Sequence, residues 1–134
     1  MRVVVTGASG FIGQYVVRAL QEAKHEVIGL DIGNPTTKNW ISANITKPLP
    51  FIKGLDVVIH LAAIANPREC DTEPTKAFDV NVNGSHQVLK MALDSGAKKV
   101  VFASSAHVYG ISPKYLPTDE SHPLWLQNNY TLTK

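Results

Sequence analysis

Short apolar runs alternate with amphipathic stretches along most of the chain. The β-branched run at residues 2–6 (RVVVT) ends at a glycine, which is typical of a strand buried in a parallel sheet. Residues 11–23 then place apolar side chains at helical spacing, so a strand, a Gly-rich turn and an amphipathic helix follow one another directly. The same reasoning predicts further strands at residues 26–30, 40–45, 56–61 and 99–104, and a long helix from Pro74 to about Ser95.

The alternation of strands and helices determines the expected topology. Strands joined by crossover helices run parallel, and right-handed crossovers cover both faces of the sheet. We therefore predict an α/β fold with a doubly wound parallel sheet of strand order 3-2-1-4-5. Residues 110–127 are rich in proline and show no periodicity, which predicts a loop. We expect this loop to run over the carboxyl ends of the strands, where ligands bind in open α/β sheets.

The composition fits one compact domain over residues 1–134. Hydrophobic residues make up 44% of the chain and charged residues 18%, which is typical of a globular protein. The formal net charge is only +2, from 13 basic and 11 acidic residues, so we expect no nucleic-acid partner. The single cysteine, Cys70, cannot form an internal disulfide and is interpreted as a reduced bystander.

The sequence shows no targeting or membrane segment. A strand pattern follows Met1 and Arg2 directly, without the apolar stretch and cleavage site of a signal peptide. No apolar run approaches the ~20 residues that a membrane helix requires. We therefore expect a cytoplasmic location and no membrane partner.

Three glycines spaced three residues apart separate the first strand from the first helix. Gly7 allows the chain to turn tightly, Gly10 allows the backbone to approach a pyrophosphate, and Gly13 allows helix and strand to pack closely. Phosphates at such a turn lie on free N–H groups at the positive end of the helix dipole. An ordinary tight turn is the alternative, but the flanking strand and helix favour a dinucleotide site in a Rossmann-type fold.

The second strand ends at Asp31, 18 residues after Gly13. A carboxylate there can accept both hydroxyls of the adenosine ribose, whereas it would repel a 2′-phosphate. No Arg or Lys follows before Lys38 to bind such a phosphate. A turn aspartate at a strand end is the alternative, but the spacing favours NAD as the cofactor over NADP.

Four further motifs follow in order along the chain. They lie at residues 60–63 (HLAA), 81–84 (NVNG), 104–110 (SSAHVYG) and 130–134 (YTLTK). Together with the glycine turn and Asp31, they resemble the motifs of extended short-chain dehydrogenases/reductases. More narrowly, the chain resembles the NAD-dependent epimerase/dehydratase family of nucleotide-sugar enzymes, and the resemblance covers essentially all of it.

The resemblance implies three catalytic residues. Tyr130 would act as general base or acid, Lys134 would bind the nicotinamide ribose and lower the pKa of the tyrosine, and Ser105 would hydrogen-bond the reacting oxygen. Such a lysine makes chemical sense, because a free phenol with a pKa of about 10 is a poor base at neutral pH. Tyr130 and Lys134 are four residues apart, so we expect them on one helix face, where an ammonium favours the tyrosinate.

The resemblance also implies which residues bind NAD. They are Gly7, Gly10, Phe11, Ile12, Gly13, Asp31, Asn44, Ile45, Leu61, Ala62, Ala63, Asn81, Tyr130 and Lys134. No metal site is expected. His60 and His107 are interpreted as structural, because no carboxylate or second histidine stands at the spacing of a triad or a metal site.

Three positions depart from the usual pattern of the family. Its dehydratases carry Asp-Glu after the residue that matches Ser105, as acid and base for the loss of water, whereas this chain has Ala106-His107. Sugar 4,6-dehydration is therefore disfavoured. Asn44 replaces a frequent aspartate that holds the adenine amino group, and its amide oxygen can still accept that hydrogen bond. Ser85 replaces a more frequent threonine.

Extended members of the family continue well beyond the position of Lys134, with the last strands of the sheet and a C-terminal substrate domain. We therefore interpret the chain as the N-terminal part of such a protein, or as the ordered part of a longer one. We expect little or no turnover from these 134 residues alone. The family is commonly dimeric through the helices that flank its fourth and fifth strands, which implies a homodimer.

The resemblance implies NAD-dependent chemistry on a small-molecule substrate, a nucleotide sugar. The favoured reaction is 4-epimerisation through a transient keto intermediate, with Tyr130 taking the hydroxyl proton. One alternative is a net NAD-dependent dehydrogenase or reductase acting on L-threonine, a uronate or a sugar. Another is a non-catalytic module that binds NAD, although the presence of both Tyr130 and Lys134 argues against it.

Overall fold

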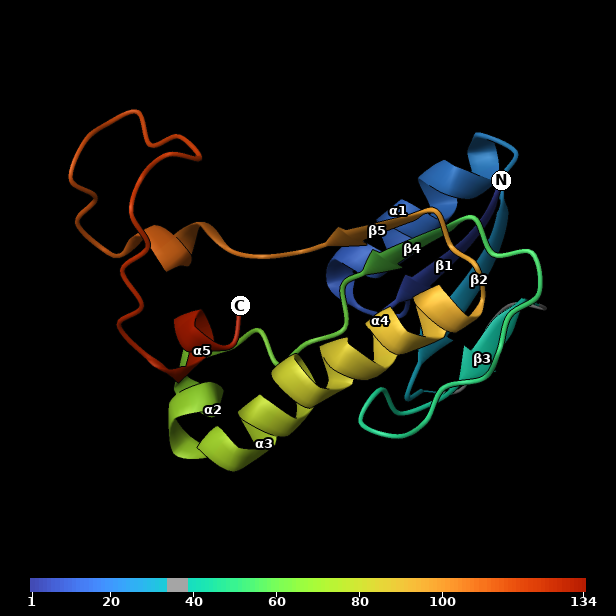
Figure 1. Ribbon diagram of the computed structural model, residues 1–134, viewed down its shortest axis with the longest axis horizontal. Helices are drawn as coiled ribbons and strands as arrows, with labels where there is room; N and C mark the ends of the chain where they lie inside the picture. The colour runs from blue at the N-terminus through green and yellow to red at the C-terminus, as the bar shows by residue number, and fades with distance from the viewer. Residues whose placement is uncertain (34–38) are drawn as a thin grey trace.

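The computed structural model describes residues 1–33 and 39–134, so Lys38, which entered the argument against NADP, lies outside the described residues. The strands are β1 (Arg2–Thr6), β2 (Glu26–Asp31), β3 (Trp40–Ser42), β4 (Val57–His60) and β5 (Lys99–Phe102). They form one parallel sheet in the order β3-β2-β1-β4-β5 (Figure 1). The predicted α/β fold and strand order are confirmed.

The register aligns the carboxyl ends of four strands at one edge of the sheet. Thr6 of β1 pairs with Leu30 of β2 and with His60 of β4, and His60 pairs with Phe102 of β5. The residues that follow these four positions are therefore delivered to the same edge. Ligands of open parallel sheets bind there.

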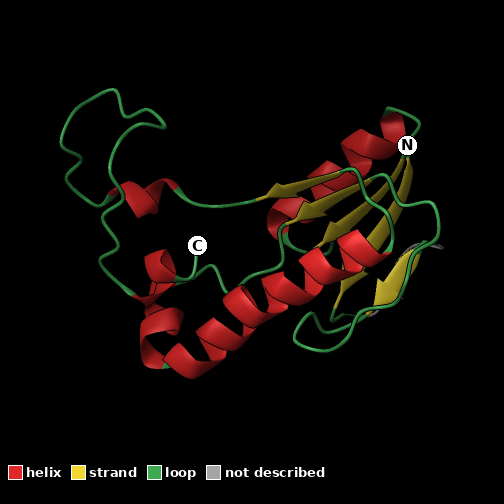
Figure 2. Cartoon of the chain, viewed as in Figure 1, coloured by secondary structure: helices red, strands yellow, loops and turns green. Residues whose placement is uncertain are grey.

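Helices α1 (Phe11–Glu22) and α4 (Gly84–Asp94) pack on opposite faces of the sheet (Figure 2). Helices α2 (Pro67–Thr72), α3 (Pro74–Phe78) and α5 (Asn129–Leu132) lie together beyond the carboxyl ends of the strands. The chain also has a π-helical turn η1 (Asp79–Asn83) and a 3-10 turn η2 (Ala106–Tyr109). Val3 and Val5 of β1 pack with Val17 of α1, whereas Val4 packs with Val88 of α4. Both faces of β1 are therefore buried, which explains its continuous β-branched run. In the described part of the chain, no helix is long and apolar enough to cross a membrane.

The long helix predicted from Pro74 is present, but its middle turn is π-helical. It runs through α3, η1 and α4 without a break. The preceding helix, α2, was not predicted although its signal is in the sequence. Pro67 occupies its first turn, and the Asn66 side chain accepts hydrogen bonds from the N–H groups of Arg68 and Glu69.

Three strands, β3, β4 and β5, are shorter than the predicted ranges 40–45, 56–61 and 99–104. β3 ends at Ser42 instead of residue 45, because its partner β2 ends at Asp31, which pairs with Ser42. β5 ends at Phe102, which pairs with His60, the last residue of β4. The ends of neighbouring strands therefore limit one another, which the apolar pattern of a single strand does not show.

Residues 110–127 form a loop without helix or strand, as predicted, but its position differs from the expectation. Figure 1 shows the loop, in orange to red, beyond the end of β5 and extending away from the sheet. The Trp125 N–H donates to the Val108 carbonyl at 2.8 Å, and the Ile111 N–H donates to the Gln127 side chain at 3.0 Å. The first bond ties the end of the loop to η2, and the second joins the two ends of the loop, so the loop closes on itself and does not lie across the strand ends.

Candidate functional site

The turn between β1 and α1 has a geometry that requires glycine. Gly7 has a φ of +67°, and a Cβ there would lie 2.8 Å from the backbone nitrogen of Ala62. A Cβ on Gly13 would collide with the Gly7 carbonyl oxygen, so α1 packs directly against the turn. The Gly10 N–H closes the turn by donating to the Gly7 carbonyl at 3.0 Å. Three backbone segments thus meet at the strand edge without side chains between them.

The amino terminus of α1 is uncapped at this turn. Gly10 is the N-cap residue and makes no side-chain hydrogen bond to the first turn. Phe11 and Ile12 are 80% and 60% exposed, and the Phe11 ring packs edge-on against Tyr15. These two residues could therefore serve a ligand through their backbone N–H groups. The dipole of the 12-residue helix favours an anion such as a phosphate at this end.

Asp31 directs its carboxylate back onto the glycine turn. Its Oδ2 accepts hydrogen bonds from the Ser9 N–H at 2.9 Å and from the Ser9 hydroxyl at 2.6 Å, and its Oδ1 accepts from the Ile32 N–H at 2.7 Å. A carboxylate offers about four lone-pair sites, of which three are used here. Asp31 can accept both hydroxyls of a ribose only after the Ser9 hydroxyl rotates away. Sequence reasoning did not single out Ser9.

A pocket of about 540 Å³ lies beside the turn, in the size range of small-molecule sites. Its lining includes eight of the residues expected to bind the cofactor: Gly7, Gly10, Asp31, Asn44, Ile45, Leu61, Ala62 and Ala63. It also includes Ser9, Leu30, Ile32, Ala43, Ile64, Glu69, Lys76 and Val80, which were not predicted. Six expected residues are outside the lining: Phe11, Ile12, Gly13, Asn81, Tyr130 and Lys134. A larger, open hollow of about 970 Å³ over α3 contains no predicted residue.

Asn44 and Ile45 contribute differently to the pocket. The Asn44 side-chain oxygen accepts from the Thr46 N–H at 3.0 Å, which leaves one lone pair for a ligand. Ile45 is buried, and a Cβ on Gly84 would lie 2.7 Å from its Cδ1. The glycine of the NVNG motif therefore lets the pocket lining pack closely against α4.

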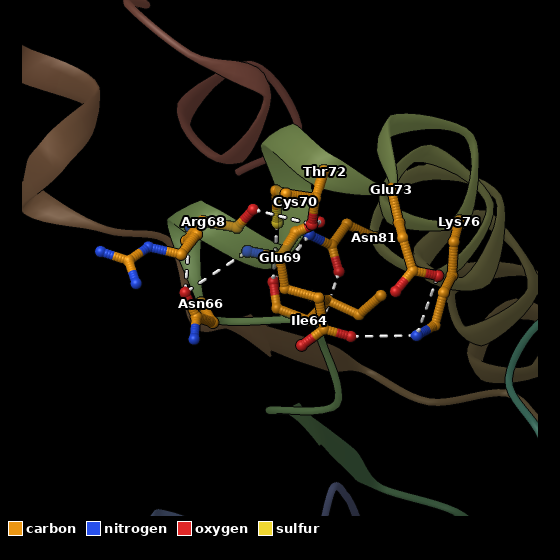
Figure 3. A network of polar contacts seen from close by, with 9 residues as sticks. All are labelled: Ile64, Asn66, Arg68, Glu69, Cys70, Thr72, Glu73, Lys76 and Asn81. Atoms are coloured by element: carbon orange, nitrogen blue, oxygen red, sulfur yellow. Dashed lines mark hydrogen bonds and ion pairs between the residues drawn. The ribbon is translucent and has the colours of Figure 1, made fainter.

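Glu69 of α2 and Lys76 of α3 form a charged part of the pocket lining. The Lys76 ammonium lies 3.0 Å from a Glu69 carboxylate oxygen and 3.5 Å from one of Glu73 (Figure 3). All three side chains are about half exposed, so the ion pairs contribute little to stability. Sequence reasoning missed this part of the lining because it missed α2.

Asn81 is buried on η1, and its side chain bonds to the protein (Figure 3). Its oxygen accepts from the Ile64 N–H at 2.8 Å, and its NH₂ group donates to the Ile64 carbonyl at 3.1 Å and to the Thr133 hydroxyl at 3.0 Å. The Thr133 hydroxyl in turn donates to the Tyr130 carbonyl at 3.0 Å. The structure therefore places Asn81 as an anchor between the segment after β4 and α5.

The three expected catalytic residues lie beyond the end of β5. Ser105 is the N-cap of η2, and its hydroxyl oxygen accepts from the His107 N–H at 3.3 Å. The His107 ring meets the Tyr130 ring edge-on, with 6.0 Å between the ring centroids. The Ser104 hydroxyl donates to the Lys134 carbonyl at 3.1 Å. The segments that carry Ser105, Tyr130 and Lys134 are thus held against one another.

Within the given 134 residues α5 holds Tyr130, and the place of Lys134 on the same helix face stays a prediction. Tyr130 is buried on α5, which is a single turn that starts with a capping box of Asn128 and Thr131 and ends at Leu132.

Lys134 and His60 lie close to Phe102 at the carboxyl edge of the sheet. The Lys134 ammonium is 5.0 Å from the centroid of the Phe102 ring, and burial lowers the pKa of Lys134. Burial, followed by the positive charge of Lys134, lowers the pKa of His60 to about 4. His60 is therefore neutral at pH 7.

The arrangement can bind a dinucleotide at the carboxyl edge of the sheet. A dinucleotide fits because the α1 amide groups are uncapped, the turn lacks Cβ atoms and a carboxylate ends β2. Among residues 1–33 and 39–134, no three His, Cys, Asp or Glu side chains are grouped so that they could hold a metal ion.

Comparisons with known proteins agree with this arrangement. A putative UDP-glucose 4-epimerase of Methanocaldococcus jannaschii is 38% identical over 98% of this chain and 47% of its own length. A solved UDP-galactose 4-epimerase is 37% identical, with a TM-score of 0.88 over 100% of this chain and 48% of its own. The UDP-glucose 4-epimerase of Thermus thermophilus, solved with NAD, is 28% identical, with a TM-score of 0.87 over 100% of this chain and 47% of its own.

The chain spans less than half the length of these relatives. Residues 3–134 match the model of the NAD dependent epimerase/dehydratase family, whose members are enzymes, so the resemblance stated from the motifs is confirmed. The family description and the NAD-bound structure also confirm NAD as the cofactor. The chain belongs to the NAD dependent epimerase/dehydratase family.

Proposed function

We propose that the complete protein interconverts the C4 epimers of a nucleotide sugar. The proposal rests on one observation: the buried Tyr130 lies with Ser105 and Lys134 beyond the end of β5, on the sheet edge that also carries the dinucleotide pocket. The similarity to proteins named UDP-glucose 4-epimerase supports the choice of reaction and substrate class. The proposed roles of single residues follow from their contacts.

The residues of the pocket fit NAD. We infer that the pyrophosphate lies against Gly7 and Gly10, which have no Cβ, and binds the uncapped N–H groups of Phe11 and Ile12 at the amino terminus of α1. Asp31 binds the adenosine ribose, and the free lone pair of Asn44 accepts a hydrogen bond from the adenine amino group. Bound NAD supplies the acceptor for a hydride that later returns to the sugar.

Tyr130 moves the proton in this proposal. Its phenolic oxygen takes the proton of the sugar 4-hydroxyl and gives it back to the opposite epimer, so the reaction has no net oxidation. Lys134 has the proposed role of binding the nicotinamide ribose. The Ser105 oxygen already accepts from the His107 N–H, so its hydroxyl proton is free to hydrogen-bond the reacting oxygen.

The residues after Ser105 argue against the loss of water from the sugar. Elimination needs an acid and a base at the sugar carbons, and Ala106 and His107 provide no carboxylate at these positions. The His107 ring packs edge-on against Tyr130 instead. This contact supports a reaction that centres on Tyr130.

Other parts of the proposal concern the complete protein. We propose that residues 1–134 are its cofactor-binding domain, that the remaining half binds the sugar, and that the protein is a cytoplasmic homodimer. The chain covers 47% of its relative from M. jannaschii, which leaves room for such a second part. Light scattering on the purified complete protein measures the oligomeric state, and a monomer at all concentrations would contradict the dimer.

Tyr130→Phe in the complete protein tests the reaction. The variant keeps the ring and its packing but loses the group that moves the proton, so we expect kcat to fall by at least about 100-fold while NAD affinity stays unchanged. The assay incubates UDP-glucose or UDP-N-acetylglucosamine with the enzyme and follows both the epimer ratio and NADH absorbance.

The outcomes separate three functions. Epimer formation without accumulating NADH, lost in Tyr130→Phe, supports the proposal. Stoichiometric NADH release would identify a net dehydrogenase. Tight NAD binding without turnover of any sugar nucleotide by the wild-type protein would identify a binding module.

A further inference from the structure

A series of buried and partly buried hydrogen bonds connects the carboxyl ends of β1 and β4 with α4. His60 is only 2% exposed and lies at its centre. Its Nδ1 is 2.6 Å from the Thr6 hydroxyl, and its Nε2 is 2.9 Å from the Ser85 hydroxyl. The roles assigned above to the cofactor pocket and to Tyr130 do not use this histidine.

The neighbouring bonds determine which nitrogen of His60 carries the proton. The Ser85 hydroxyl donates to the Asn81 carbonyl at 2.5 Å, so it can only accept from His60. The Thr6 oxygen accepts from the N–H groups of Leu61 and Ala62, both at 3.2 Å, so its own proton points to His60. His60 is therefore neutral, with its proton on Nε2.

One end of this series of hydrogen bonds reaches the cofactor pocket. The Ala62 N–H, held by Thr6, lies against the turn where Gly7 has no Cβ, and Ala62 lines the pocket. A displacement of this backbone segment would change the pocket lining directly.

The other end of the series of hydrogen bonds reaches the segment that carries Tyr130. Ser85 bonds the backbone carbonyl of Asn81, and the Asn81 side chain bonds Thr133 at 3.0 Å. Thr133 then donates to the Tyr130 carbonyl at 3.0 Å. Each donor in this series has an acceptor, so a break at His60 leaves a buried polar group without its partner.

We propose that neutral His60 is a positioning residue. Through its hydrogen bond to Ser85, and through Asn81, it fixes the position of the segment that carries Tyr130 relative to the cofactor pocket. The inference rests on the proposed function of that site. A histidine that only stabilises the core would change the amount of folded protein, whereas a positioning residue also changes kcat of the folded enzyme.

The groups that face His60 agree with a neutral ring. Thr6 of β1, Phe102 of β5 and Ser85 of α4 carry no charge. A hollow beside α4 is lined by both His60 and His86. The charged group is Lys134, whose ammonium disfavours a second positive charge on His60. A cationic ring would also turn an N–H of Nδ1 toward Thr6, which already accepts two hydrogen bonds.

Ser85→Ala in the complete enzyme tests the proposal, with Ser85→Thr as the matched control that keeps the hydroxyl. We expect Ser85→Ala to lower kcat by about tenfold or more, with KM and the Kd for NAD changed less than about threefold. Ser85→Thr should keep kcat near the wild-type value. An unchanged kcat in folded Ser85→Ala, or a loss confined to NAD affinity, would overturn the proposal.

Nitrogen-15 NMR of histidine-labelled enzyme provides a second readout. The His60 signals, assigned by their absence in His60→Gln, should show a neutral ring protonated on Nε2 at pH 7. A cation or an Nδ1–H form would overturn the proposal. This measurement needs no substrate, so it distinguishes a wrong positioning role from a wrong choice of reaction.

Discussion

The charge state of His60 differs between the folded and the unfolded chain. Burial and the charge of Lys134 lower its pKa from 6.5 to about 4 in the folded state. Between these two values the unfolded chain binds more protons than the folded protein, so the free energy of unfolding falls as the pH falls. The contribution of His60 to stability is therefore complete above pH 6.5 and is lost progressively below it.

We predict that His60 lowers the free energy of unfolding by about 2 kcal/mol between pH 7 and pH 5. His60→Gln removes this titration and keeps an amide that can donate to Ser85. Urea unfolding of wild-type and variant complete protein measures the difference, which should shrink as the pH falls. A constant difference across this range would contradict the pKa of His60.

Single residues could be predicted where one local property decides their role. Gly7 and Gly13 were recognised because a strand, a turn and a helix leave no room for a Cβ. The partners of His60 were not, because Thr6 lies 54 residues away in sequence and meets it only in the sheet. Ser9 was missed for a similar reason, since its hydroxyl is placed by Asp31 across the turn.

At the scale of elements, α5, which carries Tyr130, begins with a capping box. Its Asn128 cap accepts from the Thr131 N–H at 2.8 Å, and the Thr131 hydroxyl accepts from the Asn128 N–H at 3.2 Å. These two bonds form a capping box, which stabilises the start of the helix that carries Tyr130.

Asn128→Ala should therefore affect catalysis more than binding. We expect the loss of the cap to cost about 1 kcal/mol and to lower kcat, while NAD affinity stays unchanged because the pocket lies elsewhere. Asn128→Asp is the matched control, since its carboxylate can accept from the same N–H group. Faster hydrogen exchange at Thr131 in Asn128→Ala alone would confirm the cause, and an unchanged kcat despite faster exchange would refute it.

The elements show where periodicity is informative and where it is not. The long helix from Pro74 was predicted because its pattern spans many turns. Its π-helical middle was not, because periodicity does not register the pairing of the buried Asn81 side chain with Ile64. α2 and α5 have six and four residues, too few for a periodic signal, although Asn66-Pro67 marks the start of α2.

At the scale of the whole molecule, the dinucleotide pocket and the residues expected to be catalytic are held in place by different parts of the fold. The dinucleotide pocket is built from residues 7–80 around strands buried on both faces. The residues expected to be catalytic lie beyond β5, whose Val101 and Phe102 are 43% and 42% exposed. The pocket therefore draws on the sheet core for its rigidity, whereas Tyr130 depends on α5 and on the bonds through Asn81 and Thr133.

This difference predicts how a protein of residues 1–134 behaves. We expect it to bind NAD, because every pocket residue is present, and to show no measurable epimerisation, because the segment of Tyr130 has only a one-turn helix to hold it. Calorimetric titration with NAD and an epimer assay with UDP-glucose measure the two properties on one sample. Tyr130→Phe in the same protein should leave the NAD affinity unchanged. Steady turnover by residues 1–134 would show that α5 and the Asn81 anchor suffice to position Tyr130, and failure to bind NAD would show that the pocket needs support from the rest of the complete protein.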